Sequence, residues 1–250
     1  KEEFHETIRY FKVQIKQTGV DLRLNTRVSR EQLEREGFDE VIVATGVIPR
    51  ALKIQGSTSP QVLSYAEVLK GAEVGQKVAV IGAGGIGIDV AHYLTAQTPF
   101  SGEVPEYLQG YGILDSEKAL ALRKPKKREV TVLQRSADKI GKRLGKTTGW
   151  AHIQTLKSHG VQLFSGATYL KIDDSGLHVR VALKKGEEPK DIVFEVDNVI
   201  VAAGQEPRRE LETSLSKAGF EVHVIGGAKA ALGLDAKTAI SDGAELAAKL

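Results

Sequence analysis

One stretch constrains the fold more than any other: residues 77–94, with the sequence KVAVIGAGGIGIDVAHYL. Residues 78–81 are an apolar run typical of a buried strand, and a glycine turn and helix-like spacing follow them. In such a unit, the first glycine allows a tight turn, the second lets a ligand approach the backbone, and the third lets helix and strand pack closely. These glycines are Gly82, Gly84 and Gly87.

The turn predicts a dinucleotide site, because a pyrophosphate binds to free N–H groups at the positive end of a helix. We assign this role to Gly82, Ala83, Gly84, Gly85, Ile86 and Gly87. A glycine-rich turn without a ligand is the alternative, since such turns are common. The apolar run before the turn and the helical spacing after it favour the dinucleotide site.

Composition excludes several classes of protein. With 250 residues and 41% apolar residues, the chain is long enough for one large or two ordinary domains with a real core. No apolar run approaches the ~20 residues of a membrane span, and no signal-peptide pattern opens the chain. We therefore expect no membrane partner and a cytoplasmic protein. The complete absence of methionine indicates a piece of something longer.

The chain has no cysteine, which excludes disulfides and thiolate-held metal clusters within it. The net charge is +3, and part of it lies in the basic run at residues 123–128. This run predicts a solvated loop and no nucleic-acid partner, because no aromatic residues are interleaved with it. The six histidines show no metal-ligand spacing, so no metal site is expected.

Hydrophobic spacing predicts the remaining elements. Phe4, Ile8, Phe11 and Ile15 form an apolar stripe typical of a core-facing helix that ends before Gly19. Residues 20–24 alternate as in a half-buried strand. Residues 98–128 read as an insertion of the kind that is functional or contacts a partner. Other helices are expected at 29–36, 65–69, 150–159 and 236–250, and strands at 41–46, 130–133, 161–164, 199–204 and 222–225, with an antiparallel meander over 169–172, 177–183 and 192–196.

An internal repeat indicates two nucleotide-binding units. Residues 16–20 (KQTGV) match residues 157–161 (KSHGV), and residues 39–46 (DEVIVATG) match residues 197–204 (DNVIVAAG). If the spacing of the second copy is carried back to the first, the first copy's glycine turn falls before residue 1. The first unit is therefore expected to lack its pyrophosphate-binding half.

The residues after the second strand of the central unit indicate which nucleotide binds. When residues 98–128 are left out, Gln134 falls about 20 residues after Gly82, the usual place of the residue that contacts the adenosine ribose. Gln134 and Arg135 stand there, and no carboxylate does. A guanidinium pairs with a 2′-phosphate in bidentate fashion, so NADP is favoured over NAD. Lys139, Lys142 and Arg143 could add to the positive field at this place. In the alternative, Arg135 is only a surface cation.

Three further segments and the opening residues carry a resemblance to a known family. The segments are GKRLGKTTGW at 141–150, AGQEP at 203–207 and VIGGAKAALGLDAKTAI at 224–240, and the chain opens with KEEFHETIRYF. Together they resemble the C-terminal part of bacterial NADPH-dependent 2,4-dienoyl-CoA reductases. The wider relatives of this family include trimethylamine dehydrogenase and enoate-reductase-like flavoenzymes. The resemblance covers essentially the whole chain, and LGKTTGW is its most specific part.

The resemblance implies an α/β fold in which a Rossmann-like NAD(P)-binding domain is inserted in an incomplete second dinucleotide-binding domain for FAD. The implied division is a partial FAD domain at 1–62 and 205–250, and an NADPH domain at 63–204 with the insertion at 98–128. Members of the family add an N-terminal barrel with FMN and a four-iron cluster, which this chain lacks. Electrons pass from NADPH through FAD, the cluster and FMN to the dienoyl thioester. The chain alone is therefore not expected to reduce a dienoyl-CoA.

The resemblance also implies roles for single residues. NADPH would be held by the glycine turn with Gln134 and Arg135. The cofactor-binding residues implied elsewhere, mainly for FAD, are Ala44, Thr45, Gly46, Gly204, Gly226, Gly227, Leu234, Asp235 and Ala236. In the alternative, these residues only end strands and pack a helix, and Asp235 only caps the last helix.

No side chain is expected to act as an acid or base, because hydride transfer from NADPH to FAD belongs to the cofactors. The expected function is that of the NADPH- and FAD-binding portion of a dienoyl-CoA reductase-like oxidoreductase of unsaturated fatty acid degradation. Its partners would be the nucleotides and the N-terminal barrel. Two alternatives stay open: an amine-dehydrogenase relative that holds ADP without turnover, and a non-catalytic nucleotide-binding fragment.

Overall fold

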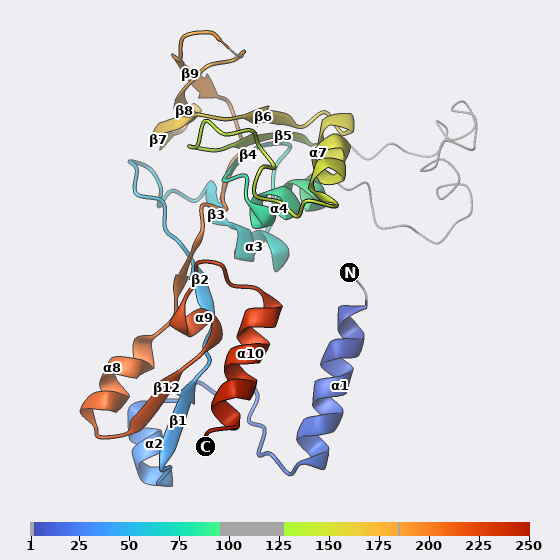
Figure 1. The fold of residues 1–250 in the computed structure, drawn as a ribbon. Coiled ribbons are helices and arrows are strands. Elements are labelled where there is room, and N and C mark those ends of the chain that lie inside the picture. Colours follow the sequence, from blue (N-terminus) through green and yellow to red (C-terminus); the bar gives the residue numbers. More distant parts are fainter. Residues whose placement is uncertain (1–2, 96–127, 185) are drawn as a thin grey trace. The chain divides into compact units, whose positions relative to one another are not determined.

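The computed structural model describes residues 3–95, 128–184 and 186–250 (Figure 1). Nearly all of the expected insertion at 98–128 lies outside the described residues. The chain divides into two compact units, one of Lys1–Thr45, Arg209–Lys229 and Ala236–Leu250, the other of Gly46–Arg208 and Ala230–Asp235. Which cofactor belongs to which unit stays a prediction. In the part of the chain that is described, no helix has the length and apolar character needed to cross a membrane.

The larger unit is built on a five-stranded parallel sheet, which confirms the α/β fold class. The strands, in spatial order, are β3 (Val62–Ser64), β10 (Asn198–Val201), β4 (Lys77–Ile81), β5 (Glu129–Leu133) and β6 (Gln162–Phe164). The chain leaves β4 toward β5 and β6, and later returns to the other side of β4 with β10. Strand order therefore reverses at β4, the place where open α/β sheets bind ligands beyond the carboxyl ends of their strands.

The two faces of this sheet are covered by different layers (Figure 1). Helices α3 (Tyr65–Leu69), α4 (Gly85–Thr95) and α7 (Gly149–Ser158) pack on one face. The predicted antiparallel meander packs on the other, as β7 (Thr168–Asp173), β8 (Gly176–Val181) and β9 (Lys190–Phe194). Alternate residues of β4 enter the two cores: Val78 and Val80 join the helices, and Ala79 and Ile81 join the meander. Both faces of β4 are buried, as its apolar run predicts.

The smaller unit holds a parallel pair, β1 (Glu40–Val43) and β12 (Glu221–Val224). Its core is small and centres on Val43, Leu215 and Ala228. The helices of this unit are α1 (Phe4–Gln17), α2 (Arg30–Glu36), α8 (Glu210–Lys217), α9 (Gly226–Lys229) and α10 (Ala236–Ala247). In the larger unit, β2 (Val47–Pro49) pairs antiparallel with β11 (Gln205–Pro207).

Several local predictions are confirmed. Ser29 accepts a hydrogen bond from the Gln32 backbone N–H and so caps α2. Helix α3 spans residues 65–69 as expected, and Ser64 and Glu67 begin it with a capping box. The last helix begins at Ala236, as predicted, although it ends at Ala247.

Two predictions in the smaller unit are wrong, and a third is only partly confirmed. Helix α1 forms, but none of its residues is buried, and Phe4, Ile8 and Phe11 are exposed. Residues 20–24 form no strand, and their apolar side chains are exposed. Strand β1 is also shorter than expected and buries only Val43. Helix α1 and residues 20–24 have the pattern of buried elements, but the described residues provide no layer or neighbouring strand to bury them.

The meander allows a test of this packing, because Leu177 is 0% exposed and Val193, on the neighbouring strand, is 42% exposed. We expect Leu177→Ala to lower the free energy of unfolding of the larger unit by about 2–5 kcal/mol, since it leaves a cavity between meander and parallel sheet. The control Val193→Ala should change it by less than about 0.5 kcal/mol. Urea denaturation followed by circular dichroism measures both, and equal losses would contradict the layer arrangement.

Candidate functional site

The glycine turn lies between the carboxyl ends of two strands. Gly82 follows β4 directly and has φ +114°, a conformation that favours glycine. Its N–H donates a hydrogen bond to the Leu133 carbonyl at the end of β5, over 2.8 Å. On the other side, a Cβ added to Gly82 would lie 2.3 Å from the Ala202 carbonyl oxygen, just past β10. The turn is therefore fixed on both sides by backbone, and no side chain fits at Gly82.

The third glycine brings α4 against this turn. A Cβ on Gly87 would lie 1.8 Å from the Gly82 carbonyl oxygen, so any side chain there would push the helix away. Gly84 and Gly85 differ, because a Cβ on either would meet no heavy atom within 4 Å, and both residues are exposed. The close approaches thus occur at Gly82 and Gly87, the glycines assigned to the turn and to packing. Gly84 and Gly85, which lie between them in the sequence, face open space.

That open space lies at the N-terminal end of helix α4. The first N–H groups of an α-helix have no partner within the helix, and the helix dipole makes its N-terminal end positive. Helix α4 begins at Gly85, directly beneath the open space. The residues present therefore provide a backbone cradle, which we define as the exposed turn at Gly84 and Gly85 with the first N–H groups of α4, and such a cradle is suited to a pyrophosphate. That a nucleotide binds there stays a prediction.

Gln134 and Arg135 follow β5, which pairs directly with β4, so they lie at the same edge of the sheet as the glycine turn. Arg135 is exposed, and its side chain has no hydrogen bond or ion pair to any described residue. Its charge acts on Tyr169, whose hydroxyl donates to the Leu133 carbonyl. Burial raises the pKa of Tyr169, and the nearby Arg135 opposes this rise. The guanidinium is therefore available to an anion.

Gln134 has a structural role that the sequence did not indicate. Its side-chain amide donates hydrogen bonds to the Ser136 carbonyl at 3.0 Å and to the Asp138 carbonyl at 2.5 Å. The Asp138 carboxylate accepts from Lys142, which, with Ser136, lowers the pKa of Asp138 below its usual value. Gln134 thus folds the loop that carries Arg135, while Lys142 is paired with a carboxylate and adds less positive field than expected.

The other predicted cofactor residues are spread over both units. Gly46 and Gly204 lie beside the paired strands β2 and β11: the Arg208 N–H donates to the Gly46 carbonyl, and the Arg50 N–H donates to the Gly204 carbonyl. Gly226 begins α9, and its N–H donates to the Asp242 carboxylate at 3.0 Å, so that N–H is already used. The remaining residues are Ala44 and Thr45 after β1, buried Gly227, and Leu234, Asp235 and Ala236 at the start of α10. Their contact with FAD stays a prediction.

The parallel sheet, with a glycine turn where strand order reverses, defines the class of the protein as an α/β protein of the dinucleotide-binding type. Residues 3–231 match the family described as pyridine nucleotide-disulphide oxidoreductase. The chain belongs to this family of flavin-dependent oxidoreductases, whose Rossmann-like domains bind FAD and NAD(P).

Several known proteins similar to the chain are longer reductases or dehydrogenases. A metal reductase from Desulforamulus reducens is 27% identical over 84% of this chain and 31% of its own length. The structure of a 2-naphthoyl-CoA reductase in complex with 2-naphthoyl-CoA superposes with a TM-score of 0.77 at 27% identity, over 100% of this chain and 32% of that one. Histamine dehydrogenase from Rhizobium sp. 4-9 has a TM-score of 0.65 at 17% identity, over 95% and 35%, and shares the fold. The chain thus spans about a third of each.

Substitutions at two glycines separate folding from binding. Gly87→Ala should destabilise the larger unit by at least about 1–3 kcal/mol, because its methyl group meets the Gly82 carbonyl. Gly84→Ala should leave stability within about 0.5 kcal/mol, since its methyl group points into open space. It should nevertheless weaken NADPH binding by about tenfold or more, because that space is where the phosphates would lie. Urea denaturation and calorimetric titration measure these effects; unchanged NADPH affinity in Gly84→Ala would contradict the cradle.

Proposed function

We propose that this chain is the electron-entry portion of a larger flavoenzyme, which binds NADPH at the glycine turn and passes its hydride to FAD. The observation that supports this most is the open backbone cradle at Gly84 and Gly85, on the same sheet edge as Arg135, which has no ion pair with a described residue. The cradle suits a pyrophosphate, and the guanidinium suits the 2′-phosphate that distinguishes NADPH from NADH.

In this proposal the protein contributes position and charge. The cofactors supply the hydride chemistry, from the nicotinamide C4 to the flavin N5. The helix α4 N–H groups hold the pyrophosphate, and Arg135 pairs with the ribose phosphate. Gln134 keeps the loop of Arg135 folded through its two hydrogen bonds. No side chain needs to transfer a proton.

For the whole enzyme, we propose a 2,4-dienoyl-CoA reductase-like activity in unsaturated fatty acid degradation, in the cytoplasm. The segments at 141–150, 203–207 and 224–240 support it, and so does the likeness to a reductase whose name includes a CoA thioester. As the family resemblance implies, the substrate would bind on a barrel with FMN and a four-iron cluster, outside these 250 residues.

Two other functions remain as candidates. An amine-dehydrogenase relative would hold ADP without turnover, and a likeness to histamine dehydrogenase at 17% identity supports the shared fold alone. A non-catalytic fragment would bind no nucleotide. Arg135 favours the NADPH proposal over the ADP alternative, because ADP carries no 2′-phosphate for the guanidinium to pair with.

Titration of the 250-residue chain with NADPH, NADH and ADP tests the proposal. We expect NADPH to bind most tightly, and Arg135→Ala to weaken NADPH by about 10- to 100-fold while leaving NADH unchanged, because a charged hydrogen-bonded pair contributes about 1.5–3 kcal/mol. The control Arg180→Ala removes an exposed arginine that is paired with Asp191 on the meander, and should change neither affinity.

Each outcome of this titration has a distinct meaning. Equal affinity for NADPH and NADH would remove the role of Arg135. Preferential binding of ADP would favour the amine-dehydrogenase alternative, and no binding at all would favour the fragment. The visible absorption spectrum of the purified chain shows whether FAD is retained.

A further inference from the structure

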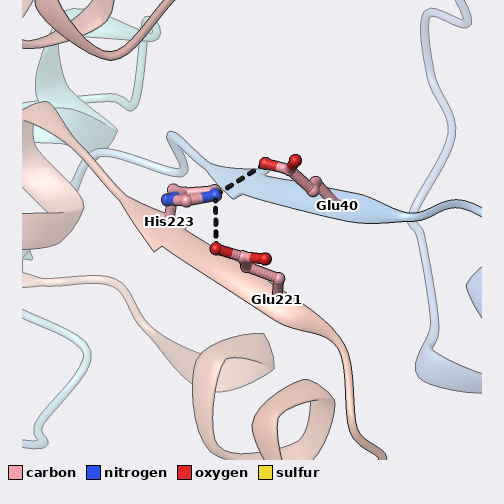
Figure 2. Close-up of side chains that lie close together, drawn as sticks. All are labelled: Glu40, Glu221 and His223. Atoms are coloured by element: carbon pink, nitrogen blue, oxygen red, sulfur yellow. Dashed lines mark hydrogen bonds and ion pairs between the residues drawn. The ribbon is translucent and has the colours of Figure 1, made fainter. Parts of the chain in front are cut away.

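Three possible metal ligands meet on the strand pair of the smaller unit. Glu40 begins β1, whereas Glu221 and His223 lie two residues apart on β12. Because side chains alternate along a strand, Glu221 and His223 share one face, and the pairing register puts Glu40 opposite Glu221. Val41, Val43, Val222 and Val224 face the core instead. The three polar side chains therefore gather on the face away from that core (Figure 2).

The imidazole is directed at both carboxylates (Figure 2). His223 Nε2 lies 2.8 Å from Glu40 Oε2 and 3.8 Å from Glu221 Oε1, and all three ligand atoms lie within 4.8 Å of one another. Ligands on a tetrahedral zinc ion, at 2.0–2.2 Å from the metal, stand about 3.3 Å from each other. The two distances from the imidazole bracket this value, so small side-chain rotations would bring three donors onto one ion.

The charges of this cluster are not balanced. Glu40 and Glu221 are neighbours across two paired strands, where like charges repel. Neither carboxylate has an ion pair with a lysine or arginine of the described chain, and both share the single imidazole. Among the described residues, the other ion pair between a histidine and a carboxylate differs: Asp173, which His178 contacts, also receives Lys171 at 2.7 Å and a hydrogen bond from Ser175. The cluster on β1 and β12 thus lacks a lysine or arginine partner within the part of the chain that is described.

We propose that Glu40, Glu221 and His223 bind a divalent transition-metal ion of the zinc class. One imidazole and two carboxylates are ligands that such ions accept, and they neutralise the ion's two charges. The side chains of Glu40 and Glu221 are 40% and 70% exposed, so water can complete the coordination. The site is independent of the nucleotide cradle, since all three ligands belong to the smaller unit.

Calorimetric titration of the 250-residue chain with ZnCl₂ tests the site. We expect one ion per chain, and a loss of affinity of at least about tenfold in Glu221→Gln and in His223→Asn, because removal of even an outer-shell partner of a metal ligand costs 10–100-fold. The matched control His178→Asn removes a histidine that also contacts a carboxylate, and should leave the affinity unchanged.

Location is checked independently by NMR. Addition of Mn²⁺ should first broaden the ring signals of one of the six histidines, and that signal should be missing in His223→Asn. If His223→Asn does not fold by circular dichroism, Glu221→Gln decides, because its side chain is mostly exposed. Dissociation constants above 1 mM for the unmodified chain, or equal zinc affinity in the unmodified chain and Glu221→Gln, would overturn the proposal.

Discussion

The larger unit depends on how closely three pieces of backbone approach one another. The Gly82 carbonyl would lie 1.8 Å from a Cβ on Gly87, and Gly82 itself stands against the Ala202 carbonyl. These approaches draw the start of α4 to the ends of β4 and β10, so the N-terminal end of the helix dipole sits where strand order reverses. Without them α4 would be displaced from the turn, which would disturb the core that α4 shares with the sheet and would open the cradle.

The internal repeat separates what a local sequence determines from what neighbours determine. Both helices of the repeat end alike: the Val20 N–H donates to the Ile15 carbonyl, the Val161 N–H donates to the Leu156 carbonyl, and a glycine with φ above +70° lies just before each valine. Beyond this point the copies differ. The residues after Gly160 pair with β5 and become β6, whereas residues 20–24 find no strand to pair with and remain exposed. Helix endings are local, but strands need a partner.

The same distinction explains what could be predicted from the sequence. The strand, turn and helix of the cradle, the cap at Ser29 and the meander follow from patterns within a few residues. The sequence did not indicate that the Gln134 amide holds its own loop, because nothing about a glutamine specifies which carbonyls it meets. It also missed the cluster around His223, since Glu40 lies far away in the chain and only the register of β1 on β12 brings them together.

The charges at the cradle illustrate why counting basic residues is a poor guide to nucleotide choice. Lys142 and Arg135 both lie on the segment that follows β5, yet Lys142 is bound to Asp138 at 2.7 Å, whereas Arg135 has no acidic partner among the residues described. A paired cation adds little field at a distance, because its carboxylate cancels most of it. Because Gln134 already folds the loop backbone, the ordering cost of binding a phosphate would fall mainly on the Arg135 side chain itself. Selectivity for a 2′-phosphate would therefore come from Arg135 and from the hydrogen bonds that hold its loop, and hardly from the net charge of the region.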